Sequence, residues 1–132
     1  MQKIFKEKAL NGVETILVVD DEKMILEVTK ELLESLGYRV YVAQSGPEAI
    51  DVYVKNKEQI NMVILDMVLP GMSGSKIFDC LQDINPDIRV LLASGYSINS
   101  EAEHILARGC RGFLPKPFRL KDLAVKVRET LS

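Results

Sequence analysis

Short apolar runs alternate with longer segments of helical periodicity along most of the chain. Four runs are uniformly apolar and too short for helices, at residues 16–19, 62–65, 90–93 and 113–114, and a more alternating run lies at 39–43. A run that is apolar at every position predicts a strand buried on both faces, because a half-exposed strand would be polar on one face. The pattern therefore predicts five strands of a buried parallel sheet.

The segments that follow these runs have apolar residues at steps of three and four, which is the spacing of amphipathic helices. They lie at residues 25–36, 45–54, 77–84, 101–108 and 120–131. In the first of them the predicted core-facing stripe is Ile25, Val28, Leu32 and Leu36, followed by Gly37 as a stop signal. In the last the stripe is Leu120, Leu123, Val127 and Leu131. One predicted helix thus follows each predicted strand.

This strict alternation predicts an α/β fold, since parallel strands need a long crossover between them, usually a helix. Right-handed crossovers favour a flavodoxin-like (βα)5 three-layer sandwich with a five-stranded parallel sheet in the order 2-1-3-4-5. A crevice is expected where the strand order reverses. Residues 1–13 are interpreted as an N-terminal tail or linker, and residues 14–132 as a single domain.

The composition is that of an ordinary globular domain and narrows the range of functions. The chain of 132 residues has a net charge of −2, which gives no reason to expect direct nucleic-acid binding. No apolar stretch approaches the roughly 18 residues needed to cross a membrane. No signal peptide is visible either, so a cytoplasmic location is expected. Cys80 and Cys110 are interpreted as reduced thiols, and with His104 as the one histidine, neither a zinc site nor histidine-based catalysis is expected.

Charged and hydroxyl side chains follow four of the predicted strands at their carboxyl ends. Asp20 and Asp21 follow the first strand, Asp66 the third, Ser94 the fourth and Lys116 the fifth. In a parallel sheet these ends share one edge, where open α/β sheets bind ligands. Each residue also has an ordinary explanation: Asp21 could cap the next helix, Ser94 could be a turn residue, and Lys116 a solvated loop lysine. Their coincidence at one edge favours a common site.

Three carboxylates at one edge indicate a cation among them, because their mutual repulsion would otherwise raise the pKa of at least one. Oxygen ligands without His or Cys favour a hard divalent ion, and Mg²⁺ (or Mn²⁺) is the usual choice where a phosphate completes the shell. A carboxylate beside such an ion can attack a phosphoryl group and form an acyl phosphate. The Lys116 ammonium and the Ser94 hydroxyl could add charge neutralisation and a hydrogen bond, so the predicted site suits phosphoryl transfer.

At these residues the sequence resembles the receiver domain of two-component response regulators. The resemblance covers nearly the whole chain and rests on "VVDDE", "LDMVLPGMSG", "SGY" and "KPF", in the family's order and spacing. It implies that Asp66 accepts phosphate from a phosphohistidine on a histidine kinase or a histidine phosphotransfer domain. It also implies that Asp20, Asp21, Asp66 and the backbone carbonyl of Val68 hold Mg²⁺, and that Lys116 binds a phosphoryl oxygen.

The resemblance also implies residues that control switching and phosphate lifetime. Ser94 would be the switch hydroxyl, and Phe113 would stand at the aromatic switch position. Because Phe113 lacks the hydroxyl of the Tyr found in many relatives, its coupling would rest on packing alone. Val68 and Tyr96 would flank the path of the water that attacks the acyl phosphate. The apolar Val68 cannot orient that water, so slow to moderate self-dephosphorylation is expected.

In the family, the surface of the fourth helix, fifth strand and fifth helix carries the signal. Its predicted charged members here are His104, Arg108, Arg111, Arg119 and Lys126. These residues could equally form an ordinary solvated surface. The resemblance further implies a cis peptide bond between Lys116 and Pro117.

The motifs "ASGYS" and "GFLPKPF" are most similar to receivers at the C-terminus of hybrid sensor histidine kinases. The chain is therefore expected to be such a receiver, and a stand-alone single-domain response regulator is the alternative. It is not expected to be an enzyme beyond assisting its own phosphorylation and dephosphorylation. A monomer or weak dimer is expected.

Three other functions fit the same sheet less well. A haloacid-dehalogenase-type phosphatase also uses an Asp nucleophile with Mg²⁺, but it carries DxD after the first strand, where this chain has Asp20-Asp21-Glu22. A flavodoxin-like FMN binder needs a Ser/Thr/Gly phosphate loop at that place, and two acids there would repel a phosphate. A degenerate receiver acting only as an interaction module would lack part of the site, whereas every site residue is present here.

Overall fold

The computed structural model describes residues 11–95 and 99–132, and within them five strands alternate with five helices. The strands are β1 (Thr15–Val19), β2 (Arg39–Ala43), β3 (Met62–Asp66), β4 (Val90–Ser94) and β5 (Gly112–Pro115). The helices are α2 (Lys23–Ser35), α3 (Gly46–Asn56), α4 (Gly74–Ile84), α5 (Ser100–Ala107) and α6 (Leu120–Leu131). None of the helices described is both long and apolar enough to cross a membrane. Every predicted strand and helix is present, with bounds shifted by a few residues.

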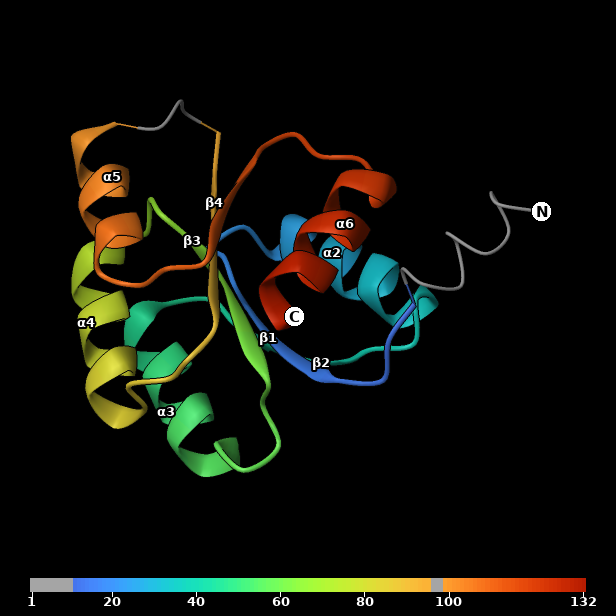
Figure 1. Ribbon diagram of the computed structural model, residues 1–132, viewed down its shortest axis with the longest axis horizontal. Coiled ribbons are helices and arrows are strands. Elements are labelled where there is room, and N and C mark those ends of the chain that lie inside the picture. Colours follow the sequence, from blue (N-terminus) through green and yellow to red (C-terminus); the bar gives the residue numbers. More distant parts are fainter. Residues whose placement is uncertain (1–10, 96–98) are drawn as a thin grey trace.

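All five strands pair in parallel, in the order β2-β1-β3-β4-β5. Helices α2 and α6 cover one face of the sheet, and α3, α4 and α5 cover the other (Figure 1). The predicted flavodoxin-like three-layer sandwich is therefore confirmed. The strand order reverses at β1, which has β2 on one side and β3 on the other, so the chain leaves β1 and β3 toward opposite faces of the sheet.

The core has two parts because the central strands bury both of their faces. In β1, Leu17 and Val19 point into the layer of α3, α4 and α5, whereas Ile16 and Val18 point into the layer of α2 and α6. This double burial explains why the sequence of the central strands is uniformly apolar. The edge strand β2 is less covered, which explains its more alternating sequence.

The buried face of α2 differs from the stripe predicted for this helix. Leu26, Thr29 and Leu33 are buried, whereas Val28 is 50% exposed and the other predicted members are only partly buried. Apolar residues occupy two adjacent faces of α2, and periodicity alone does not determine which of them the sheet covers. In α6 the prediction is wrong only for Leu120, which is exposed, while the remaining three members of the stripe are buried.

The end of α2 is closed by the predicted glycine. Gly37 has a φ of +102°, and its N–H donates to the carbonyl of Glu34 at 3.0 Å. The N–H of Tyr38 donates to the carbonyl of Leu33 at 3.2 Å, and together these bonds satisfy two of the last carbonyls of the helix. Gly37 also lies directly against the incoming chain, because a Cβ added there would collide with the carbonyl oxygen of Gly12.

The residues just before β1 are fastened to two helices of the same layer. The N–H of Gly12 donates to the carbonyl of Leu36 at 3.0 Å, at the end of α2. The Nη1 of Arg128, in α6, lies 2.8 Å from the Oε1 of Glu14 and donates to the hydroxyl of Tyr38 at 3.2 Å. These bonds fix where the chain enters the sheet.

We expect Gly37→Ala to lower the free energy of unfolding by at least about 2 kcal/mol. The substitution forces an L side chain into the left-handed region and also against Gly12. Gly71→Ala is the matched control, since Gly71 has a φ of +82° but no described atom lies within 4 Å of a Cβ added there. It should lose only the conformational part, about 1 kcal/mol. Urea unfolding followed by circular dichroism measures both, and equal losses would contradict a contribution from the Gly12 contact.

Candidate functional site

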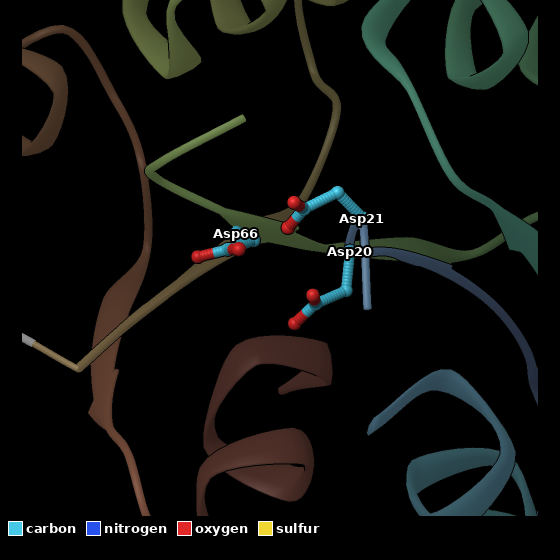
Figure 2. A group of neighbouring side chains, drawn as sticks. All are labelled: Asp20, Asp21 and Asp66. Atoms are coloured by element: carbon cyan, nitrogen blue, oxygen red, sulfur yellow. The ribbon is translucent and has the colours of Figure 1, made fainter. Parts of the chain in front are cut away.

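The carboxyl ends of β1 and β3 lie side by side, because the two strands pair with Val19 opposite Leu65. Asp20 directly follows β1, and Asp66 is the last residue of β3. Figure 2 shows Asp20, Asp21 and Asp66, hereafter the acidic cluster, gathered at this edge. One carboxylate oxygen from each of the three residues lies within 4.8 Å of those of the other two. Asp20 and Asp66 are buried and Asp21 is exposed. The fold thus brings together the three acids that the sequence analysis assigned to one site.

Backbone hydrogen bonds determine how the first two acids are presented. The N–H of Asp20 donates to the carbonyl of Ala43 at 3.1 Å, so the chain keeps its extended path past the end of β1. The Oδ1 of Asp20 accepts from the N–H of Glu22 at 3.0 Å. The N-cap of α2 is Glu22, which makes no side-chain capping bond. The alternative explanation of Asp21 as a helix cap is therefore wrong.

Lys116 supplies a positive charge to the acidic cluster. Its Nζ lies 2.5 Å from the Oδ2 of Asp20 and 3.5 Å from the Oδ2 of Asp66. The backbone N–H of Lys116 donates to the carbonyl of Ser94 at 2.8 Å, which holds the segment after β5 against the end of β4. The peptide bond between Lys116 and Pro117 is cis. Since its side chain is only 16% exposed, Lys116 is not a solvated loop lysine.

Burial and the neighbouring charges set the electrostatics of the site. Burial raises the pKa of Asp66 to about 6, with the Lys116 ammonium opposing this increase and the Asp20 carboxylate adding to it. Burial by itself would lower the pKa of Lys116. The hydrogen bond to Asp20 and the negative charges of Asp20 and Asp66 outweigh that effect, so the pKa of Lys116 is raised. One ammonium therefore contacts two of the three carboxyl groups of the acidic cluster.

The donors of the acidic cluster fit a hard divalent cation. Each of the three residues offers a carboxylate oxygen, and the group includes neither His nor Cys. Oxygen ligands of this kind are those that Mg²⁺ binds in proteins. A divalent cation would also offset the negative charge that Lys116 alone leaves unbalanced. The residues present therefore suit the ion that the sequence analysis expected.

The other predicted site residues lie around the acidic cluster. Ser94 is the buried last residue of β4. Phe113, in β5, is partly buried and packs against the core beneath α3, α4 and α5. Val68 is 54% exposed, and its N–H donates to the Oδ1 of Asp66 over a long 3.4 Å. Tyr96 lies outside the described residues.

An apolar groove lies beside the acidic cluster, and the sequence analysis does not identify it. Its lining residues come from α2 and from the chain after β4 and β5: Met24, Ile25, Val28, Thr29, Leu32, Gly95, Lys116, Pro117 and Phe118. Met24 is 76% exposed. Because Lys116 contacts both the groove and the acids, the two are continuous. The sequence does contain a signal for the groove: Ile25, Val28 and Leu32 form an apolar face of α2, but the sequence analysis interpreted this face as the buried one.

The charged residues predicted to share a signalling surface point to different neighbours. The Nη2 of Arg108 lies 3.1 Å from the Oδ1 of Asp79, in α4. The Nη1 of Arg111 donates to the carbonyl of Ser132, beyond the end of α6, at 3.0 Å. Arg108 and Arg111 are both exposed, but the guanidinium of Arg108 is engaged with α4, whereas that of Arg111 is bound at the end of α6.

Comparisons with known proteins identify the family of the chain. A family model described as the response regulator receiver domain matches residues 16–128. The sensor kinase CckA of Brucella abortus is 37% identical over 130 residues, which make up 98% of this chain and 14% of that protein. The chain thus spans a small part of the length of this relative.

Solved structures give the same result. A response regulator receiver domain protein from Clostridium thermocellum has a TM-score of 0.85 and 32% identity, over 89% of this chain and 94% of that chain. The response regulator TrrA from Thermotoga maritima, in complex with Mg²⁺-BeF, has a TM-score of 0.80 and 30% identity, over 89% of this chain and 99% of that chain. These matches favour neither a phosphatase nor a flavin protein. The chain belongs to the receiver domains of two-component response regulators.

Proposed function

We propose that Asp66 of this receiver domain accepts a phosphoryl group from a phosphohistidine, with Mg²⁺ (or Mn²⁺) bound at the acidic cluster. The observation that carries the proposal is the meeting of three carboxylates and one ammonium at a single edge of the sheet. The similarity to TrrA, whose structure was solved in complex with Mg²⁺-BeF, supports the binding of a metal ion. The domain assists its own phosphorylation and dephosphorylation and is otherwise a signalling domain.

The proposed transfer needs little more than alignment and charge neutralisation. Bound Mg²⁺, held by Asp20, Asp21, Asp66 and the backbone carbonyl of Val68, would supply positive charge to the phosphoryl oxygens. A carboxylate oxygen of Asp66 forms the bond to phosphorus while the P–N bond of the phosphohistidine breaks, and the imidazole nitrogen keeps the electron pair. Lys116, already placed 3.5 Å from Asp66, binds a phosphoryl oxygen.

Two residues on neighbouring strands are proposed to convert phosphorylation into a change of surface. The hydroxyl of Ser94 turns toward the phosphoryl group. Phe113 sits on the adjacent strand, with Leu92 opposite it in the β4–β5 pairing, and follows by repacking. A phosphoryl group changes the population of the active state only as far as it binds that state better.

The similarity to CckA supports a hybrid sensor histidine kinase as the parent protein. The phosphoryl donor is then a histidine kinase or a histidine phosphotransfer domain. A stand-alone regulator is the second candidate, since the chain is also similar to a response regulator receiver domain protein from Clostridium thermocellum. In either case we place the domain in the cytoplasm, as a monomer or weak dimer without direct contact to nucleic acid.

The apolar groove beside the acidic cluster is proposed to receive the helix that carries the phosphohistidine. A donor must bring its imidazole to Asp66, so it must cover the surface next to Lys116, which lines the groove. Met24 and Val28 present apolar side chains there, on the exposed face of α2. An amphipathic helix laid along α2 would bury both.

We expect the wild-type chain to gain one phosphoryl group on incubation with acetyl phosphate and Mg²⁺, whereas Asp66→Ala gains none. Removing the metal ion with EDTA should abolish the gain, because the carboxylates would then repel the phosphoryl donor. Intact mass spectrometry measures the labelling. Asp51→Ala, which removes an exposed carboxylate of α3, is the control and should label as the wild type does. Equal labelling of wild type and Asp66→Ala would refute the phosphoacceptor assignment.

The phosphoryl group on Asp66 should last for minutes rather than seconds in the isolated chain. Val68 offers no side-chain hydrogen bond to orient an attacking water, so Val68→Asn should shorten the half-life several-fold. Val54→Asn makes the same change on an exposed valine of α3 and should leave it unaltered. The decay of the phosphorylated mass after desalting gives the half-life, and a wild-type value of seconds would contradict the role of Val68.

Val28→Asp should slow phosphoryl transfer from a phosphorylated histidine phosphotransfer domain by about tenfold, since it places a charge in an apolar interface. Labelling by acetyl phosphate should not change, because the small donor needs no docking surface. Val54→Asp is the matched control, as Val54 is 55% exposed on the opposite face of the sheet. If Val28→Asp slowed both donors alike, or slowed neither, the groove would not be the docking site.

A further inference from the structure

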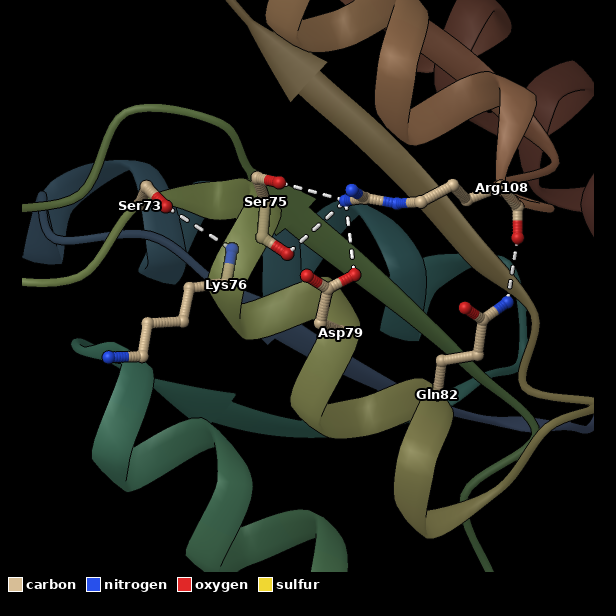
Figure 3. Close-up of polar contacts among 6 residues, drawn as sticks. All are labelled: Ser73, Ser75, Lys76, Asp79, Gln82 and Arg108. Carbon is tan, nitrogen blue, oxygen red and sulfur yellow. Dashed lines mark hydrogen bonds and ion pairs between the residues drawn. The ribbon is translucent and has the colours of Figure 1, made fainter.

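Arg108 reaches from the end of α5 to the beginning of α4. It is the C-cap residue of α5, and its Nη2 donates to the Oγ of Ser75 at 2.8 Å and to the carbonyl of Ser75 at 3.5 Å. The same nitrogen lies 3.1 Å from the Oδ1 of Asp79, and the guanidinium carbon lies 5.8 Å from the centre of the Phe78 ring. Figure 3 shows the side chain lying across the first two turns of α4.

The backbone of Arg108 is bound to the same helix. Its carbonyl accepts from the Nε2 of Gln82 at 2.7 Å. Ser75, Asp79 and Gln82 are spaced by four and three residues, so they lie on one face of α4. A planar guanidinium can bind a hydroxyl and a carboxylate while stacking on a ring, which a lysine ammonium cannot do. The contact therefore depends on arginine at this position.

The first turn of α4 is packed directly on the residue that follows Asp66. A Cβ added at Gly74 would lie 2.9 Å from the carbonyl oxygen of Met67, so the helix begins in van der Waals contact with that backbone. The Oγ of Ser73 accepts from the N–H of Lys76 at 3.2 Å and caps the helix. Residues 67–73, hereafter the acceptor loop, are thus held at both ends, by β3 and by the first turn of α4.

Within the described residues, helix α5 is otherwise held mainly by apolar packing of one face. It has eight residues, of which Ala102 and Ile105 are buried. Its N-cap Asn99 accepts from the N–H of Ala102, a bond within the helix start. Arg108 therefore makes the polar side-chain contacts that join α5 to α4 in the described part of the chain.

We propose that Arg108 is a positioning residue that couples α5 to the acceptor loop through the first turn of α4. The inference rests on the proposed function, because the coupling acts on the reaction at Asp66. The contacts of Arg108 order the start of α4 and so the acceptor loop, which begins directly after Asp66 and contains Val68. By reciprocity, a ligand that orders this loop also orders the end of α5. A folded variant without the guanidinium should therefore order the acceptor loop less well and should no longer order the end of α5 when a ligand binds.

Beryllofluoride, which imitates a phosphoryl group, tests the proposal on the full chain. Calorimetric titration at saturating Mg²⁺ should show that Arg108→Met binds beryllofluoride about fivefold more weakly than the wild type. Arg108→Lys should recover only part of the lost affinity. Ser75→Ala should also weaken the binding of beryllofluoride, and combining it with Arg108→Met should weaken binding no further than Arg108→Met does alone. Arg111→Met is the matched control, because Arg111 binds the carbonyl of Ser132 instead of α4. Circular dichroism first establishes that each variant is folded.

Hydrogen exchange measures the coupling in the opposite direction. In the wild type, beryllofluoride should slow exchange of the amides of residues 105–110 at least about threefold, and in Arg108→Met this slowing should disappear. A wild type that bound no beryllofluoride would overturn the proposed function together with the coupling that rests on it. The coupling alone would be overturned if the wild type bound beryllofluoride and Arg108→Met bound it with the same affinity and showed the same slowing of exchange at residues 105–110.

Discussion

Repulsion among the carboxylates of the acidic cluster is the constraint on which the architecture of this domain depends. Asp20 and Asp66 are buried, and buried like charges at close range are costly unless a cation balances them. Lys116 provides part of that balance from the opposite end of the sequence. The balance exists only because parallel strands bring the ends of β1, β3 and β5 to one edge of the sheet, so the site depends on the whole topology.

The strands, their order and the edge that holds the site can be predicted from the sequence, and the reason is physical. Central strands buried on both faces must be apolar throughout, and few other structures produce runs such as residues 62–65. Once the sheet is parallel, the polar residue after each run must lie at the same edge. Asp20, Asp66 and Lys116 could therefore be brought together before any coordinates were known.

Contacts between side chains of different helices could not be predicted in the same way. Helix α2 is apolar on two faces, and only the packed structure shows that Leu26 and Leu33 are buried while Val28 lines a groove. Arg108 looks like any surface arginine in the sequence. Its contacts with Ser75 and Asp79 arise from the way α4 and α5 pack, which periodicity does not describe.

The entry of the chain at Gly12 gives the two helical layers different mechanical connections. Gly12 is bound to the end of α2, and Glu14 to Arg128 of α6, so tension on the preceding residues loads the α2 and α6 layer. The acceptor loop leads into α4, and Arg108 links α4 with α5 in the opposite layer. The sheet lies between these two sets of connections. Force from the preceding chain therefore acts on one helical layer and the acceptor loop on the other, and besides the strands the two layers meet at the acidic cluster, where Lys116, in the segment that leads into α6, contacts Asp66.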